Sequence, residues 1–296
     1  MKRNGFVLFC LAGMLAVPGL LHSKDKKDKA AKPETSASAP VPALGDQEKE
    51  EFLRTAKILK MRAVNKGVAG TQWVTMTDGK LTHDGHVQFI NEAKNEFKTD
   101  RGVELNFKDS YKFNIAAYRL GRMLGIENIP PYIERKVAGK SASISWRVDG
   151  VMMDEKARHA KKLEAPDPAK WNDQMYVVRV FDQLIYNVDR NLENLLILNN
   201  WDIVMIDHTR SFRLMKTLQN AKNLVKCERT LLKNLRALDK DAVMKELQPW
   251  CTKPEMEAVM ARRDLIVKFF DDQVKQKGEG AVLYDLPKAA SAAATQ

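Results

Sequence analysis

The sequence predicts an α+β fold in two parts: a small lobe of antiparallel strands with one helix, then a mainly helical lobe. Two turns between β-prone runs predict hairpins in the first part, at Asp78-Gly79 and Ala138-Gly139. Helical periodicity over residues 110–125 and after residue 216 supplies the other observation. Strands gathered in one half of a chain and helices in the other are typical of α+β proteins.

The small lobe begins near residue 48. Residues 48–63 carry an apolar stripe at helical spacing, although the half after Ala56 fits a first strand equally well. Strands are expected at 73–76, 81–82 and 87–90, with a turn at 83–86.

His83 and His86 straddle an aspartate in that turn. A metal site is one interpretation, but turn residues explain the pattern better because no third ligand lies nearby.

The best helix pattern runs from Ser110 to Gly125, with Ser110 or Asp109 as its cap and Gly125 as its end. Another hairpin is expected from two β-prone runs, residues 132–137 and 142–148. Three further helices are predicted, at residues 171–187, 216–247 and 254–277.

Residues 181–213 organise the rest of the chain. A helix pattern ends in a polar loop, and two short apolar runs, 195–198 and 203–206, then flank a polar turn. Loop positions at strand ends collect on one edge of a hairpin, so we expect three polar residues to lie near one another: Asp189, Asn194 and Asp207.

The spacing of these three residues resembles the catalytic and metal-binding loops of the protein-kinase-like superfamily. Asn194 follows Asp189 after four residues, and Asp207 follows thirteen positions later. The pattern is most similar to phosphatidylinositol 3-/4-kinases, HipA-type kinases and secreted spore-coat and Golgi kinases. Asn191 stands where those proteins carry histidine, and His208 follows Asp207 where they carry an apolar residue.

The resemblance implies a two-lobed kinase-like fold and a role for each residue. Asp189 would orient or deprotonate the acceptor hydroxyl, and Arg190 or Arg210 would neutralise phosphate charge. Asn194 and Asp207 would hold Mg²⁺, or Mn²⁺, on the phosphates of ATP. For any one of these residues alone, capping a turn or ending a strand is the commoner explanation.

Nucleotide contacts are expected elsewhere too. Lys66, Gly67 and Gly70 precede the first hairpin, where backbone N–H groups could face phosphate, although a plain loop has the same composition. Met152 lies in the segment 149–153, which corresponds to the hinge between lobes that meets the adenine ring.

The chain departs from the family at an ion pair. Gln88 occupies the strand position of the phosphate-holding lysine, and Asn114 best fits the helix position of its glutamate partner. Both charges are lost together, which leaves neither partner stranded. Four lysines are candidate replacements for the phosphate cation: Lys66, Lys98, Lys108 and Lys112.

The N-terminus predicts export. Lys2-Arg3 precedes the apolar run 5–21, as in a secretory signal peptide or, alternatively, an uncleaved anchor. Pro18 and Gly19 argue against a spanning helix, so the mature chain is expected to have none. The expected division is a signal peptide at 1–23, a disordered linker at 24–48, lobes at 49–150 and 151–287, and a disordered tail at 288–296.

The chain is basic, with 49 Lys and Arg against 38 Asp and Glu and a net charge of +11. This excess favours acidic partners such as nucleotide phosphates, or else is a solvated lysine-rich surface. Basic and aromatic residues do not interleave, so nucleic acid is not an expected partner. In an oxidising compartment Cys227 and Cys251 could form a disulfide; the alternative is two buried thiols.

Three functions are compatible with these observations. The first is an exported kinase-like phosphotransferase acting on an unknown protein, lipid or small-molecule hydroxyl. The second is a pseudokinase that binds nucleotide or metal without catalysis, which the missing ion pair favours. The third is a structural envelope protein. The set Asp189, Asn194 and Asp207 favours the first, whereas the scarcity of ATP outside the cytoplasm argues against it.

Overall fold

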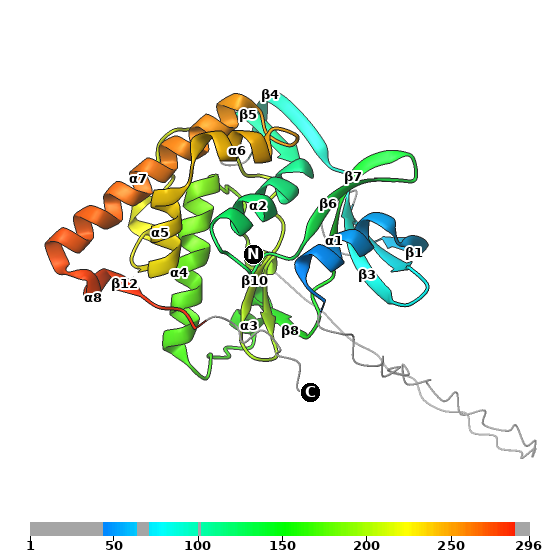
Figure 1. The fold of residues 1–296 in the computed structure, drawn as a ribbon, viewed down its shortest axis with the longest axis horizontal. Coiled ribbons are helices and arrows are strands. Elements are labelled where there is room, and N and C mark those ends of the chain that lie inside the picture. The colour runs from blue at the N-terminus through cyan, green and yellow to red at the C-terminus, as the bar shows by residue number, and fades with distance from the viewer. Residues whose placement is uncertain (1–43, 64–70, 100–101, 288–296) are drawn as a thin grey trace, which may run out of the picture. The chain divides into compact units, whose positions relative to one another are not determined.

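The computed structural model describes residues 44–63, 71–99 and 102–287 (Figure 1). The expected signal peptide, almost all of the expected linker, the expected tail, and Lys66, Gly67 and Gly70 lie outside the described residues.

The first part of the fold is a five-stranded antiparallel sheet in the order β1-β2-β3-β7-β6. Its strands are β1 (Lys57–Ala63), β2 (Thr71–Thr77), β3 (Thr82–Gln88), β6 (Tyr132–Val137) and β7 (Lys140–Trp146). The helix α1 (Asp46–Thr55) buries Phe52 and Leu53 against apolar side chains of this sheet. Both expected hairpins are present, and residues 48–63 divide into a helix and then a strand.

The expected turn at residues 83–86 is wrong, because β3 runs straight through it. A Cβ atom on Gly85 would lie 2.7 Å from Met76 Cε and 3.1 Å from Ile144 Cγ2, so glycine lets three strands pack closely. His83 stacks on Trp146 with ring centres 3.6 Å apart. The polar residues that suggested a turn are therefore paired inside the sheet.

Residues 91–110 form a second hairpin that the sequence did not predict, made of β4 (Asn91–Thr99) and β5 (Gly102–Ser110). Charged and amide side chains dominate β4, which therefore shows no apolar period, whereas β5 alternates Val103, Leu105 and Phe107 with polar residues, a strand pattern that the prediction missed. Ser110 ends β5 and lies one position before Tyr111, the N-cap of α2 (Lys112–Met123), but its Oγ accepts from Lys112 N at 3.3 Å, so the expected cap residue does bond to the first turn of the helix. Gly125 follows the helix with φ +75°, as expected of a helix end.

The second part is mainly helical and shares one apolar core with α2. Its longer helices are α4 (Pro168–Ile185), α5 (Arg229–Ala237), α6 (Lys240–Leu247) and α7 (Lys253–Lys277). The smaller elements are β8 (Val151–Asp154), α3 (Glu155–Ala160), η1 (Leu192–Asn194), β9 (Leu195–Leu198), β10 (Ile203–Met205), η2 (Ala221–Asn223), β11 (Cys227–Glu228), α8 (Glu279–Val282) and β12 (Leu283–Tyr284).

The single helix expected over 216–247 is two helices, α5 and α6, and the first begins only at Arg229. Upstream, the Asn220 side chain accepts a hydrogen bond from Lys222 N at 3.1 Å, and β11 pairs with β12. Asparagine side chains that bond to the local backbone compete with helix formation.

The predicted disulfide between Cys227 and Cys251 is not formed. Both thiols are free and buried, which was the alternative prediction. Burial raises the pKa of each thiol. Among the described residues, no helix is long and apolar enough to cross a membrane.

Candidate active site

Asp189 lies in the loop that follows α4. The helix ends at Tyr186, which adopts a left-handed conformation with φ 52°, and the chain then turns back on itself. Asn187 fixes this turn, because its N donates to Asp182 O at 2.9 Å and its Oδ1 accepts from Asp189 N at 3.0 Å. The loop therefore holds the Asp189 backbone, while the residue remains exposed to solvent.

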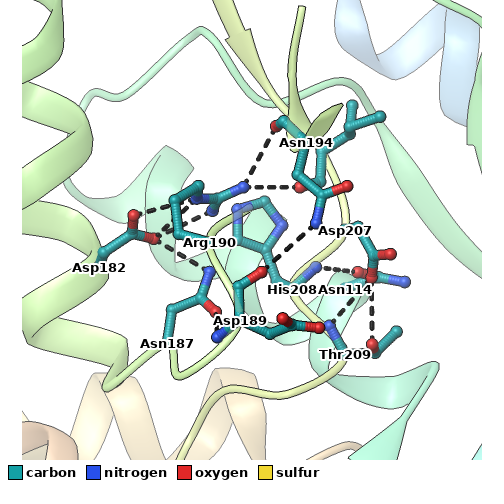
Figure 2. Close-up of polar contacts among 10 residues, drawn as sticks. Asn114, Asp182, Asn187, Asp189, Arg190, Asn194, Asp207, His208 and Thr209 are labelled. Atoms are coloured by element: carbon teal, nitrogen blue, oxygen red, sulfur yellow. Dashed lines mark hydrogen bonds and ion pairs between the residues drawn. The ribbon is translucent and has the colours of Figure 1, made fainter. Parts of the chain in front are cut away.

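The hairpin β9–β10 brings the other two expected residues to Asp189 (Figure 2). Asn194 ends η1 and points its Nδ2 at Asp189 O, 3.5 Å away. Asn194 O accepts from Ile206 N at 3.0 Å, so the residue directly before Asp207 is tied to Asn194. The thirteen positions between Asn194 and Asp207 therefore correspond to one short hairpin, whose two ends lie side by side.

Arg190 braces these loops from inside. Its Nη1 donates to Asn194 O at 3.2 Å and to Ile206 O at 2.8 Å, while Nε and Nη2 contact the Asp182 carboxylate of α4. All three guanidinium nitrogens are therefore engaged within the protein (Figure 2). The expected role of Arg190 in neutralising phosphate charge stays a prediction, and these contacts place it as a support for the loops.

Asp207 has a left-handed backbone with φ 54°. Its Oδ1 accepts from Thr209 Oγ1 at 3.0 Å and from Thr209 N at 3.4 Å. The next backbone donor, His208 N, bonds to Asn114 Oδ1 of α2 at 2.6 Å, and Thr209 O accepts from Ser110 N at 2.9 Å. The loop after β10 is thus fastened to the start of α2 and the end of β5.

Gln88 and Asn114, the two positions matched to the missing ion pair, are in contact. Asn114 Nδ2 donates to Gln88 Oε1, and both residues are buried. A neutral amide pair therefore joins β3 to α2 where the family carries a lysine and a glutamate.

Asp109 of β5 is a third carboxylate near the site, which the sequence suggested only as a possible helix cap. Partial burial raises the pKa of Asp109, the Thr209 hydroxyl opposes this shift, and the charges of Asp207 and Asp189 add to it. Partial burial also raises the pKa of Asp189, although the residue reaches solvent; the Arg210 charge opposes that shift and the Asp207 charge adds to it. The three aspartates and Arg210 therefore form one electrostatic group.

The sheet of the first part faces this group. Burial lowers the pKa of His86 in β3 to about 4, and the charge of Asp207 acts in the opposite sense. Burial raises the pKa of Tyr132 in β6, and Asp207 adds to the shift. Charges act on one another in this way only at short range, so β3 and β6 lie close to the loop that carries Asp207.

The other residues predicted to contact the nucleotide or its phosphates lie in different parts of the fold. Met152 lies in β8, next to β9, with 36% of its surface exposed. Lys108 pairs with Glu255 at 2.6 Å, and Lys98 lies on the exposed face of β4. Arg210 is paired with Glu104 of β5. Of the lysines named as replacement cations, the three that the structure describes, Lys98, Lys108 and Lys112, form no ion pair with the three aspartates.

The donor set fits a divalent cation that is held together with a nucleotide. No group of three or more His, Cys, Asp or Glu residues in the described part of the chain could hold a metal by itself. Asp207 supplies a carboxylate, and Asn194 has its amide oxygen free for a ligand because its Nδ2 faces Asp189 O. Mg²⁺ is commonly bound by one or two such protein oxygens together with phosphates and water.

Solved structures share this fold. The structure of hydra Fam20 with sugar superposes with a TM-score of 0.60 at 14% identity, covering 81% of this chain and 92% of that chain. The Golgi casein kinase superposes with a TM-score of 0.59 at 13% identity, covering 83% and 82%. A structure of the same enzyme with Mn/ADP bound gives 0.59 at 13%, covering 82% and 80%.

No family model matches the sequence, and no curated protein matches it. The similarity to the solved structures therefore concerns the fold. The chain has an atypical protein-kinase-like fold of mixed α+β type, as the sequence predicted.

Proposed function

We propose that this protein is an exported, atypical kinase-like phosphotransferase that moves the γ-phosphate of ATP to a hydroxyl acceptor with the help of Mg²⁺. The observation that carries the proposal is the junction of Asp189, Asn194 and Asp207 across the β9–β10 hairpin. Phosphoryl transfer needs little more from a protein than positioning and charge stabilisation, and these residues supply both.

Asp189 is the proposed acceptor-orienting base. Its raised pKa makes it a stronger base than an ordinary carboxylate. Its exposure leaves room for a hydroxyl group to approach. Asn194 and Asp207 would hold the cation, which when bound neutralises charge on the nucleotide phosphates.

The nucleotide is proposed to lie between the sheet and the loop that carries Asp207, near Gln88. Support comes from the effect of the Asp207 charge on His86 and Tyr132. One neighbour was crystallised with Mn/ADP and is by name a Golgi enzyme, which supports metal–nucleotide use and export in this chain by analogy of fold.

A nucleotide-binding module without catalysis is the second candidate. The neutral Gln88–Asn114 pair favours it, because the cation that the family places on the phosphates is missing there. The two candidates share nucleotide binding and differ in transfer.

The test is a thermal-shift titration of the mature chain with ATP, with and without Mg²⁺ or Mn²⁺. A ligand that binds only the folded state raises its stability by about 2.7 kcal/mol at one hundred times Kd. Stabilisation by ATP that requires the metal is the expected result. A flat response to ATP and ADP with either metal would contradict both candidates.

A further inference from the structure

The backbone of Asp207 has an unfavourable conformation that its surroundings must hold in place. An L-residue at φ 54° is strained, less so for aspartate than for most residues. Such conformations persist only where neighbouring contacts over-determine them. The contacts made by the two residues after Asp207 are therefore part of what sets the direction of its carboxylate.

Asn114 makes the most enclosed of these contacts. Its side chain is fully buried, as is His208, whose N–H it accepts at 2.6 Å. A hydrogen bond shielded from water is electrostatically stronger than the same bond at the surface. The contact joins α2 directly to the residue that follows Asp207 (Figure 2).

The amide of Asn114 is itself held in one orientation. Its Oδ1 must face the donor His208 N, so its Nδ2 faces Gln88 Oε1 of β3. Only a residue with both an acceptor and a donor serves both neighbours. A glutamate here would offer acceptors alone and would need a cation at position 88, which this chain lacks.

We propose that Asn114 is a positioning residue that holds Asp207 in its metal-binding orientation, with Gln88 fixing the Asn114 amide. This inference rests on the proposed function, since it assigns Asp207 a metal–nucleotide ligand. Gln88 and Asn114 together form an uncharged relay from β3 through α2 to the metal loop. The relay replaces the positioning part of the family's ion pair and leaves phosphate binding to other groups.

The experiment compares Asn114→Leu with Asn234→Leu. Asn234 is a matched control, because its Nδ2 donates to Leu124 O at 2.9 Å at the other end of α2. Calorimetric titrations measure the Kd of ADP with Mn²⁺ and the Kd of ADP in EDTA for each variant, and thermal melts report folding. Gln88→Met, which removes the acceptor for Asn114 Nδ2 and keeps the Asn114 side chain itself, is the milder variant should Asn114→Leu not fold.

Removing the support of a metal ligand typically lowers metal affinity about 10- to 100-fold. We expect Asn114→Leu to weaken Mn²⁺–ADP binding by that factor and to leave ADP binding in EDTA within about twofold of the wild type. We expect Gln88→Met to show a smaller loss of Mn²⁺–ADP affinity. We expect Asn234→Leu to lower the melting temperature without changing the Mn²⁺–ADP affinity.

Two results would overturn the proposal. The first is that Asn114→Leu binds Mn²⁺–ADP with the same affinity as the control Asn234→Leu. If Asn114→Leu does not fold, the same comparison is made with Gln88→Met. The other is an equal loss of ADP affinity with and without metal, which marks a merely structural role. In either case, metal-dependent binding by the wild type that Asp207→Asn abolishes would leave the proposed function standing. A wild type that binds no Mn²⁺–ADP would contradict both.

Discussion

Arg190 and Asp182 form a two-point ion pair beneath the candidate site. Arg190 Nε lies 3.0 Å from Asp182 Oδ2, and Nη2 lies 3.0 Å from Oδ1. The side chains are only 12% and 11% exposed. Because the same guanidinium holds the carbonyl groups of Asn194 and Ile206, the pair connects α4 to both loops of the site.

Asp182→Ala is therefore expected to destabilise the fold strongly. Removing one member of a buried ion pair leaves the other charge unpaired and typically costs about 3–5 kcal/mol of unfolding free energy. Urea denaturation at neutral pH measures the loss. Asp272→Ala, which breaks the exposed pair with Lys268, is the control and should leave the midpoint nearly unchanged. Equal midpoints for the two variants would show that the Asp182–Arg190 pair does not brace the loops.

Asp109→Asn is expected to stabilise the protein at neutral pH. Burial raises the pKa of Asp109 in the folded state above the unfolded value of about 3.9. The ionised group therefore lowers stability at pH values above the folded pKa. This penalty shrinks as the pH falls from the folded to the unfolded pKa and vanishes below the latter. Melting temperatures of variant and wild type from pH 7 to pH 3 should differ most at pH 7. A difference that grows toward acid pH would reverse the assigned sign.

Cys227 and Cys251 are expected to resist alkylation in the folded protein. The thiolate is the reactive form, and burial raises the pKa of both thiols. Mass spectrometry after iodoacetamide treatment without reductant should find both residues unmodified in buffer and modified in guanidinium chloride. Protection that persists in denaturant until a reductant is added would show a disulfide and contradict the free thiols of the structure.

The sequence predicted the parts of the fold where pattern and local structure agree. The hairpins β2–β3, β6–β7 and β9–β10 each have a polar turn between β-prone runs. The positions of Gln88 and Asn114 could be matched because each lies at a definable place on a strand or helix, and the structure brings them into contact. Spacing, together with the preceding helix and the surrounding hairpin, pointed to Asp189, Asn194 and Asp207, and Asn194 does contact Asp189.

Other features were not predictable for physical reasons. The strand β4 is largely charged and gives no apolar period, although its partner β5 alternates Val103, Leu105 and Phe107 with polar residues. Gly85 suggested a turn because glycine at a turn and glycine at a tight strand crossing look the same in sequence. The contacts of Arg190 with Asp182, Asn194 and Ile206 depend on how the loops fold back onto α4, which no local pattern records.

The rates at which the wild type and Asp189→Asn release ADP from Mg²⁺–ATP distinguish the proposed phosphotransferase from a binding module. Water can serve as the acceptor while the natural hydroxyl is unknown. A coupled assay that detects free ADP then gives the rate. Loss of a general base typically slows a reaction about 10²- to 10⁴-fold. We expect slow ADP release by the wild type, a fall of that size in Asp189→Asn, and unchanged affinity for Mg²⁺–ATP. Equal rates for the two proteins would contradict the role of Asp189. A wild type that binds Mg²⁺–ATP but neither releases ADP nor phosphorylates itself would contradict the enzyme and support the binding module.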